Sequence, residues 1–221
     1  MTTQRVIRKE DTAAMPERYR ATLYNSLSGF KSLGLIGTIN EHGKTNIGVF
    51  NSIVHVGANP PLLGMIFRPE SVRRHTLENI LNGKFYSINH VHASMLPMAH
   101  LASAKFDDDV SEFQACGFTE EYTSISKAPY IAESRIKMML EYRMHFPIPL
   151  NGTIFLIGEI MEAIIPESCI QEDGFVDLQS AGTITVAGLD AYSSTSLLDR
   201  YSYARPDSIP HSLLHRTEKS T

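Results

Sequence analysis

The chain has 221 residues, of which 43% are hydrophobic, and 20 Lys and Arg against 24 Asp and Glu give a formal net charge of −4. This length fits one domain with an ordinary buried core. The mildly acidic balance argues against general affinity for nucleic acid, which requires a basic surface. The two cysteines, Cys116 and Cys169, lie far apart and indicate neither a disulfide framework nor a zinc site. The N-terminus lacks the apolar core of a signal peptide, and no apolar run approaches the roughly 20 residues that span a bilayer. We therefore expect a cytoplasmic protein without membrane association.

The first elements in chain order are a short helix and a β-hairpin. Residues 1–15 are polar and predict no regular structure, whereas residues 17–30 carry apolar side chains at the spacing of one helix face. Apolar runs at 33–39 and 45–56 predict two strands, and Gly43 suits the hairpin turn between them.

A strand and a helix follow a pair of prolines. The proline pair within residues 58–61 breaks regular structure, and the almost entirely apolar residues 62–68 predict a strand buried on both faces. Residues 76–83 predict a helix, with Thr76 as its cap and Asn82-Gly83 as a left-handed stop.

The middle of the chain alternates between the two kinds of structure. Residues 84–91 predict a strand, and residues 93–106 predict a partly helical segment that Pro97 interrupts. Residues 107–119 predict a surface connection with a short helix.

Two long strands and an arm are expected toward the C-terminus. Residues 134–146 alternate between apolar and polar side chains, which predicts a strand with one exposed face. Residues 152–165 predict a second long strand that Gly158 allows to bend. The polar, tyrosine-bearing tail beyond about residue 190 predicts an extended arm. Together these elements predict an α+β fold that is mainly β and barrel-like.

A basic cluster precedes the helix at 76–83. Arg68, Arg73, Arg74 and His75 stand at the end of the helix where cations cost roughly 0.3–1 kcal/mol each unless something compensates them. A solvated basic turn is one explanation. The other is an anion site, because the unpaired N–H groups of a helix N-terminus suit a phosphate and arginines form charge-assisted hydrogen bonds with phosphate oxygens.

The order of several motifs resembles the flavin reductase-like family of FMN-binding split-barrel proteins, which includes the flavoredoxins. The matching motifs are "GKTNIGVFNS" (43–52), "ANPPLLGMIF" (58–67), "RHTLENI" (74–80), "FYSIN" (85–89), "FDDDVSEFQACGFT" (106–119) and "IFLIGEI" (154–160). No single motif is diagnostic, but their order and spacing are fairly specific over residues 30 to 165.

The resemblance implies a six-stranded Greek-key split barrel with peripheral helices, which forms a homodimer with FMN at each end of its interface. It implies a single domain over 1–221 with a core at about 30–165, an N-terminal helix and a C-terminal extension. The residues placed along the isoalloxazine are Phe50, Asn51, Ser52 and Ile53, and those placed at the phosphate are Arg68, Arg74, His75 and Thr76. Ser103 and Lys105 would approach the flavin from a neighbouring loop. Family members often have Lys-Asp or Arg-Asp before the threonine, so Arg74-His75 is a departure that leaves the role of His75 open.

The function implied is hydride transfer from NADH or NADPH to flavin by an NAD(P)H:flavin oxidoreductase. The flavin carries out the redox chemistry and the protein orients it, so the lack of a G-x-S-x-G elbow or a Rossmann G-x-G-x-x-G motif is compatible with this function. Two alternatives remain: an electron carrier that keeps FMN permanently, as a flavoredoxin does, and a flavin-free binding module.

Metal binding is not expected. His90 and His92 would share one face of a strand near His100, but no carboxylate or cysteine lies close in sequence to complete a site. The acidic run at 107–109 lacks the spacing and glycine of an EF-hand loop, which favours a solvated turn.

Overall fold

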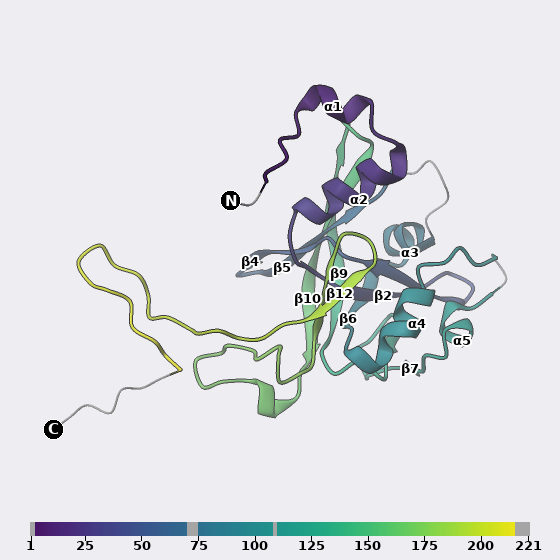
Figure 1. Ribbon diagram of the computed structural model, residues 1–221. Coiled ribbons are helices and arrows are strands. Elements are labelled where there is room, and N and C mark those ends of the chain that lie inside the picture. Colours follow the sequence, from purple (N-terminus) through teal and green to yellow (C-terminus); the bar gives the residue numbers. More distant parts are fainter. Residues whose placement is uncertain (1–2, 70–74, 108–109, 215–221) are drawn as a thin grey trace.

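The computed structural model describes residues 3–69, 75–107 and 110–214, and a seven-stranded sheet forms its centre (Figure 1). The spatial order is β3-β2-β6-β9-β10-β5-β4, and every neighbouring pair is antiparallel. The strands are β2 (Gly34–Ile39), β3 (Thr45–Phe50), β4 (Ile53–Ala58), β5 (Pro61–Phe67), β6 (Phe85–His90), β9 (Lys137–Ile148) and β10 (Thr153–Ile164).

The connection between β3 and β4 closes this sheet. These two strands occupy opposite ends of the strand order, yet only Asn51 and Ser52 separate them in the chain. Because two residues span at most about 7 Å, the end of β3 and the start of β4 must lie close together. The sheet therefore curls into a barrel, and Asn51-Ser52 lies at its seam.

Two smaller sheets complete the β structure. β1 (Lys31–Ser32), β11 (Ile184–Ala187) and β12 (Ala191–Ser194) form a three-stranded sheet, and β7 (Glu120–Glu121) pairs with β8 (Tyr130–Ile131). The sequence pattern predicts an extended arm beyond about residue 190, which includes 191–194, and no strand at 184–187. That expectation was wrong for this hairpin, because its strands are four residues long and their hydrophobic signal is correspondingly short.

Short helices surround the barrel. They are α1 (Lys9–Ala13), α2 (Glu17–Leu27), α3 (His75–Gly83), α4 (Leu96–Leu101) and α5 (Glu112–Ala115), with 3₁₀ turns η1 (Ala93–Met95) and η2 (Glu167–Cys169). In Figure 1, α1 and α2 lie together at one end of the molecule, and α4 and α5 lie together on one side. Within the described ranges, none of these helices has the length and apolar character needed to cross a membrane.

Two apolar clusters hold the barrel and its additions together. The barrel cluster joins the strands to α3 and contains Ile36, Met65, Phe67, Leu77, Ile80, Tyr86, Ile88, Leu140 and Leu156. A second cluster packs α4, α5 and β11 against the outside of β2 and β3, and it includes Leu35, Ile47, Ala99, Phe113 and Ile184. Burying each such side chain contributes about 1.5–3 kcal/mol, so α3 is fixed to the barrel by Leu77 and Ile80.

The mainly β split-barrel class is confirmed, with one difference in strand count. The expected barrel had six strands, whereas the sheet has seven, because the predicted strand at 45–56 is two strands divided at Asn51-Ser52. The apolar run continues through this division, so hydrophobicity alone did not reveal it.

Three local expectations were wrong. Residues 9–13 form α1 although no structure was expected before residue 15. Pro97 lies at the start of α4 and does not interrupt a helix, because the first turn needs no N–H from proline. The left-handed residue that ends α3 is Lys84, with φ of 67°, and not Gly83.

The alternation of apolar and polar residues at 134–146 also predicted the wrong side chains to be buried and exposed. Lys137 and Met139 are buried with exposed fractions of 5% and 1%, although Lys137 was placed on the exposed face. The Lys137 ammonium donates to Glu121 and to the Ala132 carbonyl, and these partners compensate its burial. Met144 and Phe146 are exposed because the outer part of β9 extends beyond the barrel core.

We predict that Gly37→Ala destabilises the fold by about 1–3 kcal/mol through overpacking. A Cβ at this position would lie 2.2 Å from the Pro129 carbonyl oxygen and 2.5 Å from Ser87 Oγ. The control is Gly83→Ala, whose Cβ would meet nothing closer than 3.7 Å. Urea unfolding followed by circular dichroism measures both, and equal stabilities for the two variants would contradict this packing.

Candidate functional site

The barrel seam is fixed by contacts on both sides. The Phe50 ring, at the end of β3, packs edge to face on Phe67 of β5 with 4.7 Å between centroids. The Ser52 carbonyl accepts a hydrogen bond of 3.2 Å from the Ile66 N–H, and the Ile53 N–H donates to Ser32 Oγ at 3.3 Å. The four residues expected along the isoalloxazine, Phe50, Asn51, Ser52 and Ile53, are consequently held as one half-buried strip of the barrel edge.

Two cations lie beside this strip. Lys31 Nζ donates to the Gly188 carbonyl at 3.0 Å, and Asn51 Nδ2 donates to the same oxygen at 3.3 Å. Burial, and then the positive charge of Arg68, lowers the pKa of Lys31, so the two cations are close enough to repel each other. Among the described residues, no carboxylate forms an ion pair with either of them. An anion bound here would offset that repulsion.

The start of α3 packs directly on β3. Thr76 is nearly buried, and a Cβ at Gly48 would lie 2.6 Å from its Oγ1 and 2.9 Å from the Phe50 ring. In the orientation that satisfies the Asn46 amide, its Oδ1 accepts from Thr76 Oγ1 at 3.0 Å. The Thr76 hydroxyl therefore ties the helix to the strand. The first-turn N–H groups of α3, which lack partners within the helix, are then the better donors for an anion.

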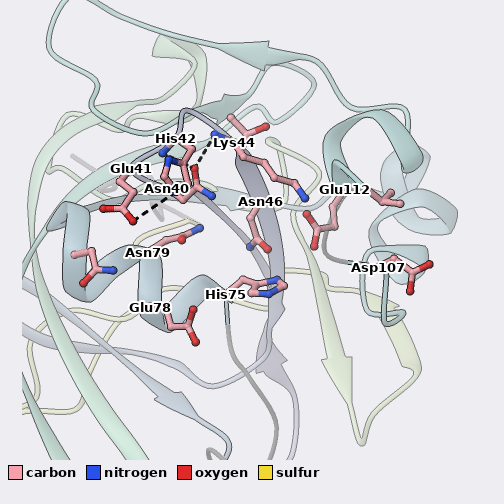
Figure 2. A pocket seen from close by; sticks show the side chains of 13 residues that line it. Asn40, Glu41, His42, Lys44, Asn46, His75, Glu78, Asn79, Asp107 and Glu112 are labelled. Carbon is pink, nitrogen blue, oxygen red and sulfur yellow. Dashed lines mark hydrogen bonds and ion pairs between the residues drawn. The ribbon is translucent and has the colours of Figure 1, made fainter.

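A small polar cavity lies on the other side of this helix start. It has a volume of about 180 Å³ and is lined by Asn40, Glu41, His42, Lys44, Thr45, Asn46, His75, Glu78, Asn79, Asn82, Asp107, Val110 and Glu112. Figure 2 shows Lys44, His75 and Glu112 converging on the hollow beside Asn46. Burial raises the pKa of Glu112, while His75 and Lys44 oppose that shift.

This cavity does not suit the flavin ring. Ligand pockets for molecules of that size are usually about 300–1,000 Å³ and mostly apolar, whereas this one is smaller and carries four carboxylates. Its acidic lining also disfavours a phosphate. The cavity is therefore a poor candidate for the flavin ring and for its phosphate.

The remaining residues that were expected at the flavin lie away from the seam or outside the described residues. His75 begins α3 and lines the cavity, and Arg74 lies outside the described residues. Ser103 Oγ donates to the His100 carbonyl at 2.7 Å at the end of α4, and Lys105 is exposed. Within the part of the chain that the structure describes, no hydrogen bond or ion pair joins Ser103 or Lys105 to the seam.

Sequence reasoning missed Lys31 and Asn46. Lys31 precedes a strand by a few residues and gives no local signal, because its relation to Arg68 depends on the closure of the barrel. Asn46 lies within the "GKTNIG" stretch, two residues before Gly48, so the two residues share one face of the strand. That spacing was the available signal that Asn46 faces the same neighbours as Gly48.

The histidines considered for metal binding have other partners. His92 Nε2 hydrogen-bonds the Glu133 carbonyl at 3.0 Å, and His100 Nδ1 contacts Tyr192 Oη at 2.6 Å. Over residues 3–69, 75–107 and 110–214, no three His, Cys, Asp or Glu side chains gather as a metal site would require.

Known proteins are similar to this chain in sequence or in architecture. A split-barrel protein from Shewanella frigidimarina NCIMB 400, assigned to the flavin reductases, is 46% identical, with a TM-score of 0.88 over 91% of this chain and 100% of its own. Flavoredoxin of Desulfovibrio vulgaris (Miyazaki F) is 21% identical, with a TM-score of 0.65 over 81% of this chain and 92% of its own, a likeness in fold alone. An uncharacterized protein of Halalkalibacterium halodurans, BH2278, is 25% identical over 201 residues, which cover 86% of this chain and 94% of that protein.

The family model described as the flavin reductase like domain matches residues 31–179. This match begins at Lys31, includes the whole seven-stranded sheet and ends before the β11–β12 hairpin. The chain therefore belongs to the flavin reductase-like family.

Proposed function

We propose that the chain is a flavin reductase that binds FMN and takes a hydride from NADH or NADPH. The observation that carries the proposal is the seam, where the half-buried strip at 50–53 shares the Gly188 carbonyl with Lys31, beside which Arg68 also lies. Family membership supports a flavin. The proposal has three further parts. The flavin binds along this strip, the electron donor is a nicotinamide nucleotide, and the chain is a single FMN-binding domain with its core at about 30–165.

The residues of the seam fit FMN in shape and charge. Gly48 leaves room for the Phe50 ring and Thr76 to pack closely on β3, which fixes the position of the α3 start relative to the strand. Lys31 and Arg68, which form no ion pair with a carboxylate of the described residues, suit a dianionic phosphate. We place Arg74, His75 and the first-turn N–H groups of α3 at the same phosphate.

Bound FMN would supply the hydride and electron transfers, and the protein would supply orientation. The Asn51 amide is held by the Gly188 carbonyl, so its main role would be to fix the seam backbone along the flavin. Backbone N–H groups near Ser52 would stabilise negative charge on the flavin, because fixed dipoles need no reorganisation. Ser103 and Lys105 would reach the flavin only from the loop that follows α4.

The first test compares FMN with riboflavin. Each charge-assisted hydrogen bond to the phosphate contributes about 1.5–3 kcal/mol, so we expect FMN to bind at least about 100-fold more tightly. Arg68→Ala should weaken FMN about 10-fold and leave riboflavin unchanged, whereas Arg18→Ala on α2 should change neither. Flavin fluorescence titration measures both ligands. Equal affinities for FMN and riboflavin would contradict the proposal that these residues bind the FMN phosphate.

The second test concerns the electron donor. We expect anaerobic NADH or NADPH to bleach the bound flavin within seconds in stopped flow, because an open flavin face allows the two rings to touch at about 3–3.5 Å. Ser52→Phe should suppress bleaching, and Ser124→Phe, on an exposed loop between β7 and β8, should not. If neither nicotinamide bleaches the loaded native protein, the electron-carrier function replaces the reductase, and slow release of FMN on dilution would support that carrier.

The third test concerns assembly. From Arg143 to Pro147, β9 is exposed on both faces, and the Val54 and Val56 side chains of β4 are exposed as well. A sheet normally buries its apolar face against another layer, so we propose a homodimer around this projecting sheet. Light scattering should give about twice the chain mass of 24.6 kDa. A monomer that holds a full complement of FMN would contradict the homodimer.

A further inference from the structure

Three side chains connect the polar cavity to the start of α3. Asn46 of β3 lies between Thr76 and Glu112, with one amide atom 3.0 Å from Thr76 Oγ1 and the other 3.1 Å from Glu112 Oε1. Asn46 and Thr76 are only 7% and 9% exposed, so water has little access to their polar atoms. The three side chains therefore satisfy one another, and we call Glu112, Asn46 and Thr76 the relay.

The charge of Glu112 decides which way the Asn46 amide points. An ionised carboxylate only accepts hydrogen bonds, so it accepts one from Asn46 Nδ2, and Asn46 Oδ1 then accepts from the Thr76 hydroxyl. A neutral Glu112 can donate to Asn46 Oδ1 instead, which turns Nδ2 toward Thr76 Oγ1 at 3.0 Å. The same positions of the heavy atoms serve both hydrogen-bond patterns.

The two patterns leave the Thr76 hydroxyl in different states. In the first, its one proton is donated to Asn46, so Oγ1 has no hydrogen for another acceptor. In the second, Oγ1 accepts from Asn46, and the proton is released for a group outside the relay. Thr76 is the second residue of α3, beside the first-turn N–H groups that we assign to the phosphate. A phosphate oxygen bound there is an acceptor that the released proton can reach.

The surroundings of Glu112 favour its neutral form more than water does. Burial raises the pKa of this carboxyl, and hydrogen bonds from backbone N–H groups and the charges of His75 and Lys44 only partly oppose the rise. Burial and then the charge of Glu112 raise the pKa of Cys116, one helical turn further along. The other charged or titratable side chains that line the cavity with Glu112 are Glu41, His42, Glu78 and Asp107.

We propose that Glu112 and Asn46 are positioning residues that direct the Thr76 hydroxyl toward the FMN phosphate when Glu112 is neutral and away from it when Glu112 is ionised. This inference rests on the proposed function and deepens it, because the affinity of the phosphate site then depends on a proton held in the neighbouring cavity. Protonation of Glu112 at lower pH would strengthen FMN binding and leave riboflavin binding unchanged.

The first experiment replaces the proton of Glu112 with a permanent donor. The amide of Glu112→Gln can accept from the Ile47 N–H, as the native carboxyl does, and donate to Asn46 Oδ1 at every pH. This variant should bind FMN about tenfold more tightly than the native protein at about pH 8, and the advantage should shrink as the pH falls toward about 5.5. A Gln variant with native affinity across this range would overturn the proposal.

The comparison with the Gln variant isolates Glu112 from other titrations. Both proteins retain His75, and the phosphate of FMN, with its second pKa of about 6, is the same ligand in both titrations. Glu41→Gln is the matched control, because Glu41 lines the same cavity but pairs with His42. It should keep the native pH dependence of FMN binding.

The second experiment separates positioning of the hydroxyl from simple loss of charge. Removing the charge of Glu112 favours an anion by itself, but that effect needs no hydroxyl. Thr76→Val keeps the shape of the side chain and removes its proton, so Glu112→Gln should give no gain in FMN affinity when it is added to Thr76→Val. Thr76→Ser keeps a hydroxyl and should retain the gain. An equal gain in the Val background would show that charge alone acts and that the proposed positioning is wrong.

A measurement without flavin tests the relay itself. In protein with isotope-labelled asparagine, the NMR signal of the Asn46 side-chain amide, assigned by its absence in Asn46→Ala, should shift with pH, because the acceptor of Nδ2 changes from a carboxylate to a hydroxyl. Glu112→Gln should abolish this shift. An Asn46 signal that does not change with pH in the native protein would overturn the relay.

The two proposals fail in different ways. If the native protein binds no flavin, the proposed function fails, and the amide measurement still decides whether Glu112 controls Asn46. If FMN binds tightly with an affinity that Glu112→Gln does not alter, the proposed function stands and the positioning role fails.

Discussion

A two-residue connection between opposite edges of a seven-stranded sheet is the constraint on which this structure depends. Asn51 and Ser52 are too short to cross a flat sheet of that width, so the sheet must close. Closure brings the end of β3 to β5, where the Phe50 ring packs on Phe67. The candidate site is therefore a direct result of how the barrel closes.

The strand β3 organises the site along its length. Its successive same-face positions are Asn46, Gly48 and Phe50, which meet the cavity, the start of α3 and the seam in that order. Because one rigid strand carries all three contacts, the distance from the helix N-terminus to the seam is fixed. Charge is divided along the same line, with carboxylates around the cavity and the Lys31–Arg68 pair beside the seam.

The barrel core and the outer part of β9 differ in burial. Inside the barrel, nine buried side chains from the strands and α3 form one cluster that can stabilise a single chain. Beyond Tyr142 the long strand β9 has exposed side chains on both faces, and the arm adds further exposed apolar groups. The barrel centre is thus well packed, whereas the outer part of β9 presents the kind of exposed apolar surface that usually marks an interaction site.

The sequence by itself determined the fold class, most strands and the candidate cofactor, because hydrophobic runs and the order of short motifs survive as local signals. It placed Arg68, His75 and Thr76 together at one helix start, since they are neighbours in the chain. Only the tertiary structure decided that β3 and β4 are separate strands, that Lys31 lies near Arg68, and that the Thr76 hydroxyl faces Asn46. The burial of Lys137 and the exposure of Met144 also depended on tertiary structure. These properties depend on contacts between residues that are far apart in the chain. A periodic pattern predicts which side chains share a face of a strand or helix, but it does not predict which part of the protein covers that face.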